Sequence, residues 1–427
     1  MSEAEWRKLD AIEHVVEGNW TMEMGARAAG LSKRQFRRLR RKYEAASNKH
    51  QAVVHGNTGR RPWNHLKDSE LTKVLGLREK LYAGFNDTHF TEKLVEVHRV
   101  RISRQSVQRV LRSKQIVSPR CHNGRKRRKR RERRSRAGWM VLWDGSTHDW
   151  LEGRGPRLCL MGGIDDATGK ILHGAHFVEH ECSAGYLRLL SELVRHHGIP
   201  LEIYADKHSC LRRNDEHWSI EEQLAGRQEP PQVQRAAETL GIEIIWANSP
   251  QAKGRIERAW NTFQDRLVAE LRLAGATTAQ QANAVLERYR RDHNRRFARQ
   301  PKDKNPAWRK LAKGLRLEEI CAFHITAKVG NNSTVRYQNQ VFDLAGPTAA
   351  SIAGKTAQIR HLLDGRLHIY VDEQLVHHSQ LAPPTKAPMR RRKHAPSASS
   401  TKQPGKRKLT FKQIMLKHKG TAEGKAA

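Results

Sequence analysis

Residues 137–300 alternate strand-like and helix-like segments, and this alternation constrains the fold of the chain more than any other feature. Apolar runs end at Asp144, at Asp165 and at Asp206, and a further strand is predicted over 171–178. Amphipathic segments separate the later strands and predict helices. The predicted order is β-β-β-α-β-α-β-α, with the first strands paired antiparallel. We therefore expect an α/β domain.

Three acidic residues lie at strand ends or on a helix in this predicted order. Asp144 and Asp206 are predicted at the C-terminal ends of two strands, and Glu257 on a helix over 253–273. Singly, each has a plain explanation: the aspartates cap turns, and Glu257 pairs with Lys253 one turn back. Together they predict a carboxylate cluster, which needs cations to stay ionised. Hard oxygen ligands suit Mg²⁺ or Mn²⁺, and two such ions would drive phosphoryl displacement on DNA.

Four stretches around these acids are distinctive: WDGSTHDWLEGRG (143–155), GIDDATGKIL (163–172), YADKHS (204–209) and NSPQAKGRIERAW (248–260). Through them the chain resembles insertion-sequence transposases of the DDE type, closest to the ISNCY group, with a retroviral-integrase-type catalytic core. This resemblance implies an RNase H-like fold for 137–300 and metal-binding, catalytic roles for Asp144, Asp206 and Glu257. It also implies that Lys253 and Arg258 contact DNA phosphates.

Two further acidic positions bear on this assignment. Asp165 is interpreted as a turn residue after the second strand, with a supporting role as the alternative. The separation between Asp206 and Glu257 is longer than in many such transposases, which makes Asp206 the least secure of the three acids. Acids inside the inserted segment follow no strand-like run and rank below Asp206.

Residues 1–50 predict a helix-turn-helix domain. Helices are expected over 3–16, 21–29 and 33–43, and Gly30 and Ser32 form the turn before the last of them. That last helix is crowded with basic residues, as expected of a recognition helix that enters the major groove. An ordinary helical hairpin with a solvated basic face is the alternative. The predicted DNA-contacting residues are Ser32, Lys33, Arg34, Arg37 and Arg38.

Residues 65–117 predict a second helix-turn-helix domain, either plain or winged. Its expected DNA contacts are Arg104, Gln105 and Arg109, on a helix over 103–113. A structural helical bundle is the alternative, because this polar face is less basic than the first.

The remaining regions are a basic linker, a β-rich segment and a tail. The linker, 118–136, includes RKRRKRRERRSR (125–136), which predicts a phosphate-binding arm or a nuclear localisation signal. Residues 325–382 read as short alternating strands and predict a small β-barrel, which contacts DNA or another protomer, or simply caps the core. Residues 383–427 predict a disordered basic tail.

The charge of the chain selects among partners. A formal net charge of +36 favours double-stranded DNA, both element ends and target, as the partner. No apolar run of spanning length, signal peptide or lipidation motif suggests a membrane. The five cysteines are scattered and form no zinc or disulfide pattern, and no nucleotide-binding P-loop is present. We expect a cytoplasmic, nucleoid-associated bacterial protein.

The sequence thus predicts a multidomain transposase with N-terminal all-α domains, an α/β core and a C-terminal β-barrel. It would bind the terminal inverted repeats of its element as a homo-oligomer and catalyse strand cleavage and strand transfer. The alternatives are a non-catalytic DNA-binding regulator derived from a transposase, and an RNase H-like nuclease that cleaves without joining.

Overall fold

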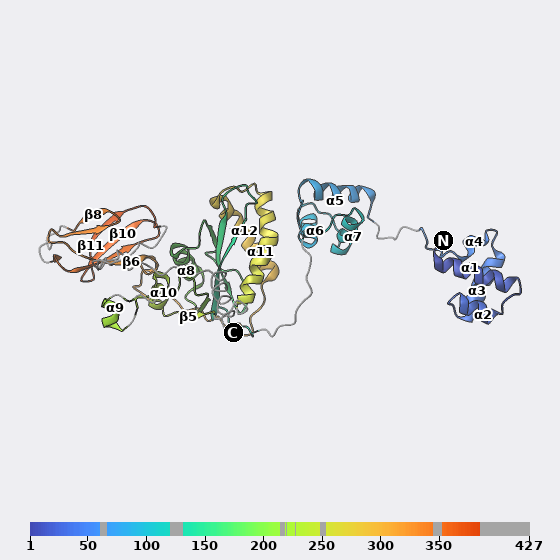
Figure 1. Cartoon of the computed structure of the whole chain (residues 1–427), viewed down its shortest axis with the longest axis horizontal. Coiled ribbons are helices and arrows are strands. Elements are labelled where there is room, and N and C mark those ends of the chain that lie inside the picture. Colours follow the sequence, from blue (N-terminus) through green and yellow to red (C-terminus); the bar gives the residue numbers. More distant parts are fainter. Residues whose placement is uncertain are drawn as a thin grey trace, which may run out of the picture. The chain divides into compact units, whose positions relative to one another are not determined.

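The computed structural model describes most of the chain, in two compact units (Figure 1). Unit 1 comprises Met1–Ala83 and Asp87–Ser118, and unit 2 comprises Gly84–Asn86 and Pro119–Ala427. The described residues are 1–59, 66–119, 131–213, 218, 220–226, 228–247, 253–344 and 352–384.

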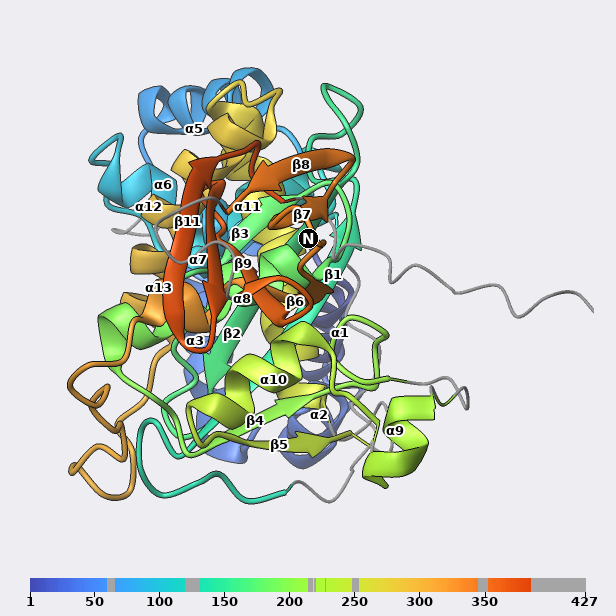
Figure 2. The same ribbon diagram turned by 90° about the vertical axis from the view of Figure 1, so that its left-hand side faces the viewer.

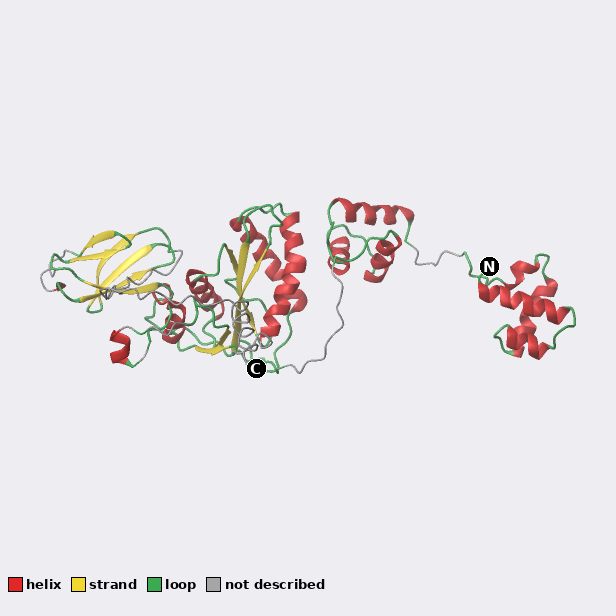
Figure 3. Ribbon diagram, in the orientation of Figure 1, coloured by secondary structure: helices red, strands yellow, loops and turns green. Residues whose placement is uncertain are grey.

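Every described regular element of unit 1 is a helix (Figure 3). The predicted caps are present in its first part: the Thr21 hydroxyl accepts from the Met24 amide at 3.3 Å, and the Ser32 hydroxyl accepts from the Gln35 amide at 3.2 Å. The helices are α1 (Glu3–Val16), α2 (Met22–Ala28), α3 (Lys33–Ala45) and α4 (Lys49–Val53), followed by α5 (Asp68–Lys80), α6 (Asp87–Glu96) and α7 (Arg104–Ser113).

A close approach at Gly25 sets the packing of the first helices. A Cβ atom at Gly25 would lie 2.4 Å from Val15 Cγ2 and 2.7 Å from Phe36 Cζ. Only glycine therefore allows α2 to pack this closely against α1 and α3. Val15, Phe36 and their neighbours form one buried apolar cluster, so the basic side chains of α3 are left on its outer face.

Unit 2 contains a five-stranded sheet of order β3-β2-β1-β4-β5. The first three strands are paired antiparallel, whereas β1 with β4 and β4 with β5 are parallel, which confirms the predicted α/β class and antiparallel start. The elements are β1 (Met140–His148), β2 (Leu158–Asp165), β3 (His176–Val178), α8 (Ser183–His197), β4 (Glu202–Ala205), α9 (Ile220–Ala225), α10 (Gln232–Thr239), β5 (Glu243–Trp246), α11 (Gly254–Leu273) and α12 (Ala279–Phe297).

Two details of the predicted order are wrong. The third strand is shorter than 171–178, because Gly174 adopts a left-handed φ of 89° that interrupts the extended backbone before His176. The inserted segment after β4 also contains a short helix, α9, that the apolar pattern does not indicate.

Side chains that alternate along β1 separate two apolar layers. Val141 and Trp143 are buried in a cluster with α8 and α10, whereas Leu142 is buried with α11 and α12. Helices therefore cover both faces of the sheet, and α10 packs against β5 (Figure 2). Strand β2 is buried along its whole length, as expected for a strand between two layers.

Gly162 on β2 determines how closely α11 approaches the sheet. It is the register partner of Asp144, and a Cβ atom there would lie 2.8 Å from Trp260 Cη2 of α11. The missing side chain leaves room for the Trp260 ring directly opposite Asp144, so α11 begins close to the strand that carries this acid.

The C-terminal strands form a four-stranded antiparallel sheet, β11-β10-β9-β6, and a β7-β8 hairpin (Figure 3). The hairpin lies within the predicted β-rich segment 325–382 and turns at Gln338 and Asn339 with positive φ angles of 49° and 64°. Closure into a barrel stays a prediction. The elements are α13 (Leu317–Ile320), β6 (Phe323–Lys328), β7 (Thr334–Tyr337), β8 (Gln340–Asp343), β9 (Thr356–His361), β10 (Arg366–Val371) and β11 (Gln374–Gln380).

Candidate active site

Two of the predicted acids lie on neighbouring strands. The parallel register pairs Leu142 of β1 with Tyr204 of β4, so that Asp144 and Asp206, two residues further along each strand, come side by side. Asp206 directly follows β4, as predicted. Asp144 does not end its strand: β1 continues to His148, because residues 145–148 keep pairing with β2. The sequence prediction for the end of this strand is therefore wrong, although the two acids converge.

The Lys253 ammonium lies between these two carboxylates. Its Nζ is 2.6 Å from Asp144 Oδ1 and 2.9 Å from Asp206 Oδ2. The side chain of Lys253 is 9% exposed and that of Asp144 16%, whereas that of Asp206 is 43% exposed. Lys253, predicted as a phosphate contact, is thus held between the two acids in this structure, and its contact with phosphate stays a prediction.

The charge balance of this pair is acidic. The pKa of Asp144 is raised to about 6, chiefly by burial; Lys253 counteracts this increase, and the charges of Asp206 and Glu181 add to it. Burial alone would lower the pKa of Lys253, but its contacts with Asp144 and Asp206 outweigh burial and raise it. One ammonium therefore does not fully compensate the carboxylates around it.

Glu257 occupies the first turn of α11, on the helix predicted for it, and its side chain is exposed. Within the described ranges, no three His, Cys, Asp or Glu side chains come together as a metal centre. The structure brings together Asp144 and Asp206 but leaves Glu257 outside the pair. The first five residues of the 248–260 motif lie outside the described residues.

Sequence reasoning missed a third carboxylate beside Asp144. Glu181 precedes α8, and a Cβ atom at Gly145 would lie 2.6 Å from its Oε2. The Tyr186 hydroxyl donates to Glu181 Oε1 at 2.5 Å, and His208 Nδ1 lies 3.7 Å from the same oxygen. No motif marks Glu181, since only the packing of α8 against the sheet brings it to this place.

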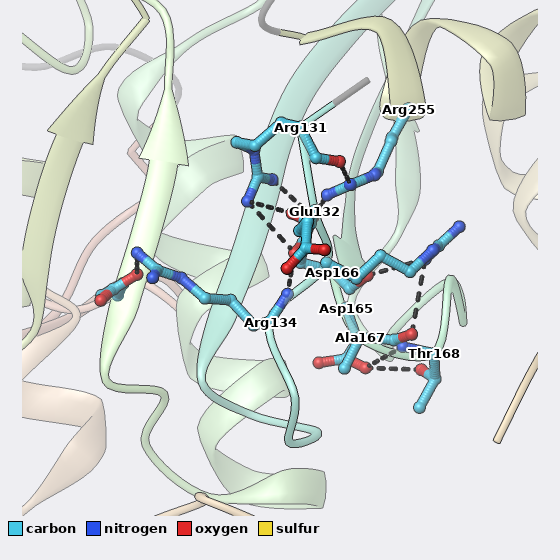
Figure 4. A network of polar contacts seen from close by, with 10 residues as sticks. Arg131, Glu132, Arg134, Asp165, Asp166, Ala167, Thr168 and Arg255 are labelled. Atoms are coloured by element: carbon cyan, nitrogen blue, oxygen red, sulfur yellow. Dashed lines mark hydrogen bonds and ion pairs between the residues drawn. The ribbon is translucent and has the colours of Figure 1, made fainter. Parts of the chain in front are cut away.

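Two consecutive acids at the end of β2, Asp165 and Asp166, have different roles. Asp165 accepts from the Gly138 amide at 2.9 Å, from the Thr168 amide at 2.9 Å and from the Thr168 hydroxyl at 2.5 Å, which confirms its interpretation as a turn residue. Asp166 is fully buried and binds the guanidinium groups of Arg131 and Arg255 (Figure 4). The sequence gives no indication of this second cluster.

The remaining predicted DNA-contacting side chains are exposed. They lie on α3, on α7 and on the first turn of α11, where the Arg258 Nε donates to the Gly254 carbonyl at 2.8 Å. Ser32 and Ser103 are the N-caps of α3 and α7. The exposed residues are Ser32, Lys33, Arg34, Arg37, Arg38, Arg104, Gln105, Arg109 and Arg258. Most of the basic run in the linker, 120–130, and of the tail, 385–427, lies outside the described residues.

Among the helices that the structure describes, none has the length and apolar character needed to cross a membrane.

Two relatives match nearly the whole chain in sequence, although no family model matches it. The chain is 33% identical over 379 residues to the putative transposase y4bF of Sinorhizobium fredii, covering 86% of this chain and 79% of that protein. It is 26% identical over 422 residues to the transposase for insertion sequence IS1202 of Streptococcus pneumoniae, covering 88% of this chain and 86% of that protein.

Solved structures similar to this chain are retroviral integrases. The catalytic core of BIV integrase is 16% identical, covers 35% of this chain and 79% of its own, and has a TM-score of 0.26. The HTLV-2 integrase core in complex with magnesium is also 16% identical, covers 36% of this chain and 87% of its own, and has a TM-score of 0.25. The intasome of simian T-cell lymphotropic virus, in complex with PP2A regulatory subunit B56 gamma, is 14% identical, covers 73% of this chain and 99% of its own, and has a TM-score of 0.31. These TM-scores are too low to establish a shared fold.

Proposed function

The chain belongs to the transposases of insertion sequences, and we propose that it cuts and joins DNA strands at the site formed by Asp144 and Asp206. The observation that carries the proposal is the convergence of these two carboxylates on one cation, Lys253 Nζ. The reaction is a phosphoryl transfer in which water cleaves a strand and a DNA 3′-hydroxyl joins one.

The donor set of this site fits a divalent metal ion. Two carboxylates that share one ammonium offer hard oxygen ligands at a place already suited to positive charge. Asp144 and Asp206 would hold the metal, and Glu257 would join them from the first turn of α11. Two Mg²⁺ or Mn²⁺ ions would polarise the scissile phosphate and activate the attacking oxygen.

The residues of the chain have separate tasks in this scheme. Asp144, fixed in the middle of β1, is the rigid ligand, whereas Asp206 follows its strand and is more exposed. Lys253 holds the two carboxylates together beforehand and yields its place on metal binding. Glu181, held by Tyr186, adds negative charge beside Asp144. The RNase H-like core of the proposal rests on the β3-β2-β1-β4-β5 order and on the family.

The helical unit supplies DNA recognition in this proposal. Helix α3 presents exposed Lys33, Arg34, Arg37 and Arg38 after a capped turn, and α7 presents Arg104, Gln105 and Arg109. They read the terminal inverted repeats of the element, and two or more copies of the chain bring two element ends together. Arg258, at the start of α11, contacts phosphate beside the acids.

The test uses the full chain, Mg²⁺ or Mn²⁺, and duplex DNA that carries the inverted repeats flanking the coding region. Wild type should give nicked and joined products. Asp144→Asn, Asp206→Asn and Glu257→Gln should each reduce product formation by at least about a thousandfold while DNA binding persists. Glu238→Gln, an exposed acid on α10, is the matched control and should stay active.

The outcomes separate the rival functions. Full activity in the three acid variants overturns the assignment. Binding without any product from the wild type indicates a non-catalytic regulator, and cleavage without joining indicates a nuclease. Loss of activity for the aspartate variants alone would remove Glu257 from the site and turn attention to Glu181.

A further inference from the structure

Asp166 fastens the basic linker to the start of α11 (Figure 4). The buried carboxylate accepts from Arg131 Nη2 at 2.7 Å and from the Arg134 amide at 2.7 Å, and it forms a close ion pair with Arg255. Arg255 also donates to the Arg131 carbonyl. A linker that leads from the helical unit is therefore attached two residues before Glu257, at a fully buried acid.

More positive charge gathers here than Asp166 can neutralise. The Arg133 guanidinium donates to the Asp166 carbonyl at 2.7 Å. The positive charges of Arg255, Arg299 and Arg258 repel it. Burial, followed by these neighbouring arginines, lowers the pKa of Arg133, whereas Asp166 raises it. Arg299 is anchored beside it, because its amide donates to the Thr168 carbonyl at 2.9 Å. The cluster consists of Arg131, Arg133 and Arg255, which contact Asp166, together with Arg258 and Arg299, whose charges act on Arg133.

We propose that this arginine cluster binds a phosphodiester of duplex DNA beside the candidate active site, with Asp166 as the residue that positions its guanidinium groups. Guanidinium forks match phosphate oxygens in pairs, and an anion would relieve the mutual repulsion of the arginines. The rest of the run 125–136 continues the same charge along the chain, which suits the repeated phosphates of a duplex rather than a single free anion.

This inference rests on the proposed function, because its ligand is the DNA substrate. The DNA affinity that it predicts can be measured without strand cleavage or joining. A DNA strand held at the cluster would lie next to the first turn of α11, which carries Lys253 and Glu257. Arg133 and Arg299 are the side chains whose loss tests the contact most directly, because neither is bound to the Asp166 carboxylate in an ion pair that the structure records.

The experiment measures DNA affinity of the full chain in EDTA as a function of salt, by fluorescence anisotropy on a labelled duplex carrying the flanking inverted repeats. Arg133→Ala and Arg299→Ala should each weaken binding and reduce the slope of log affinity against log salt by about 0.9. Arg133→Lys should keep the slope and recover part of the affinity. Arg195→Ala removes a 60% exposed arginine of α8 and is the matched control, with an unchanged slope.

Unchanged slopes for both cluster variants, or an equal loss in Arg195→Ala, would overturn the inference. A second variant, Asp166→Asn, tests the positioning role: trypsin should cut the linker at 131–136 faster than in wild type, and added duplex should protect it less. If this variant does not fold, Arg133→Ala and Arg299→Ala still test whether the cluster binds DNA phosphate. Because EDTA prevents metal-dependent chemistry, a failed cleavage assay would count against the proposed function and leave the phosphate site standing.

Discussion

The two charged clusters at the start of α11 have opposite compositions. Asp144 and Asp206 share the single ammonium of Lys253, whereas Asp166 is one carboxylate among several guanidinium groups, including that of Arg255. Lys253 and Arg255 are two residues apart, so one turn of chain serves both clusters. The first has an excess of negative charge and the second an excess of positive charge.

One member of each cluster has a shifted pKa, with burial as the main cause and neighbouring like charges as a further one. Burial and neighbouring acids raise the pKa of Asp144 even with an ammonium at 2.6 Å, and burial with neighbouring arginines lowers the pKa of Arg133. Each cluster is thus left short of the opposite charge. A divalent cation and a DNA phosphate are the two ligands of phosphoryl transfer that would supply them side by side.

Lys253→Met should give the largest effect, because it leaves two neighbouring carboxylates uncompensated. In EDTA we expect the free energy of unfolding of unit 2 to fall by about 3 kcal/mol, since one partner of a largely buried ion pair is lost. Mn²⁺ should restore more stability in this variant than in wild type, because no ammonium competes for the site. Urea unfolding with and without Mn²⁺ measures both effects.

Lys310→Met, an exposed lysine, is the control for that measurement and should change neither the stability nor the response to Mn²⁺. If Lys253→Met gained no more stability from Mn²⁺ than wild type does, the acid cluster would not be a cation site, and the contrast between the two clusters would fail.

Gly162→Ala should act on both clusters at once, through the position of α11. The new methyl group would lie 2.8 Å from Trp260 Cη2, so the Trp260 ring, or α11 with it, must shift away from the place where Gly162 pairs with Asp144. We expect a loss of about 2 kcal/mol in the free energy of unfolding, and a lower rate of strand cleavage. Gly76→Ala in α5 meets no atom within 4 Å and should be neutral or slightly stabilising. Equal stability of both variants would show that Gly162 does not set the place of α11.

The order of strands and the place of Asp206 follow from short apolar runs and turn residues, which are local signals. The residues that contact these acids in space are harder to predict from the sequence. Lys253 reads as a surface cation, yet the fold buries it, because this N-cap residue of α11 lies against Asp144 of β1 and Asp206, which directly follows β4. Glu181 reaches Asp144 only through the packing of α8.

Asp166 is a clearer example of a residue whose contacts the sequence does not predict. Beside Asp165 in a turn it looks like a second polar turn residue, and its arginine partners are separated from it by 35 and 89 positions in the chain. Such partners are fixed by tertiary packing and leave no spacing in the sequence. Glu257 is the converse case: a motif identifies it, but the structure leaves its side chain exposed and outside the acid pair.

The smallest expected effect concerns His293, which packs against α11 from α12 and lies outside both charged clusters. His293 of α12 is buried, and its ring centroid lies 4.9 Å from that of Phe263 on α11. Burial lowers the pKa of His293 from 6.5 to about 4, so the unfolded chain binds a proton first as the pH falls. The free energy of unfolding should therefore decrease by about 1 kcal/mol between roughly pH 7 and 5.5 because of His293.

Asp144 titrates in the opposite sense. Its pKa is raised from 3.8 to about 6, so the folded state binds the proton first and gains stability as the pH falls through this range. Only a comparison of variants resolves the two contributions. The loss on acidification should be smaller in His293→Gln than in wild type, and larger in Asp144→Asn, as measured by urea unfolding at each pH. If His293→Gln kept the full pH dependence of wild type, His293 would contribute nothing to the acid sensitivity, which would then come from other buried histidines with a lowered pKa, such as His197 and His324.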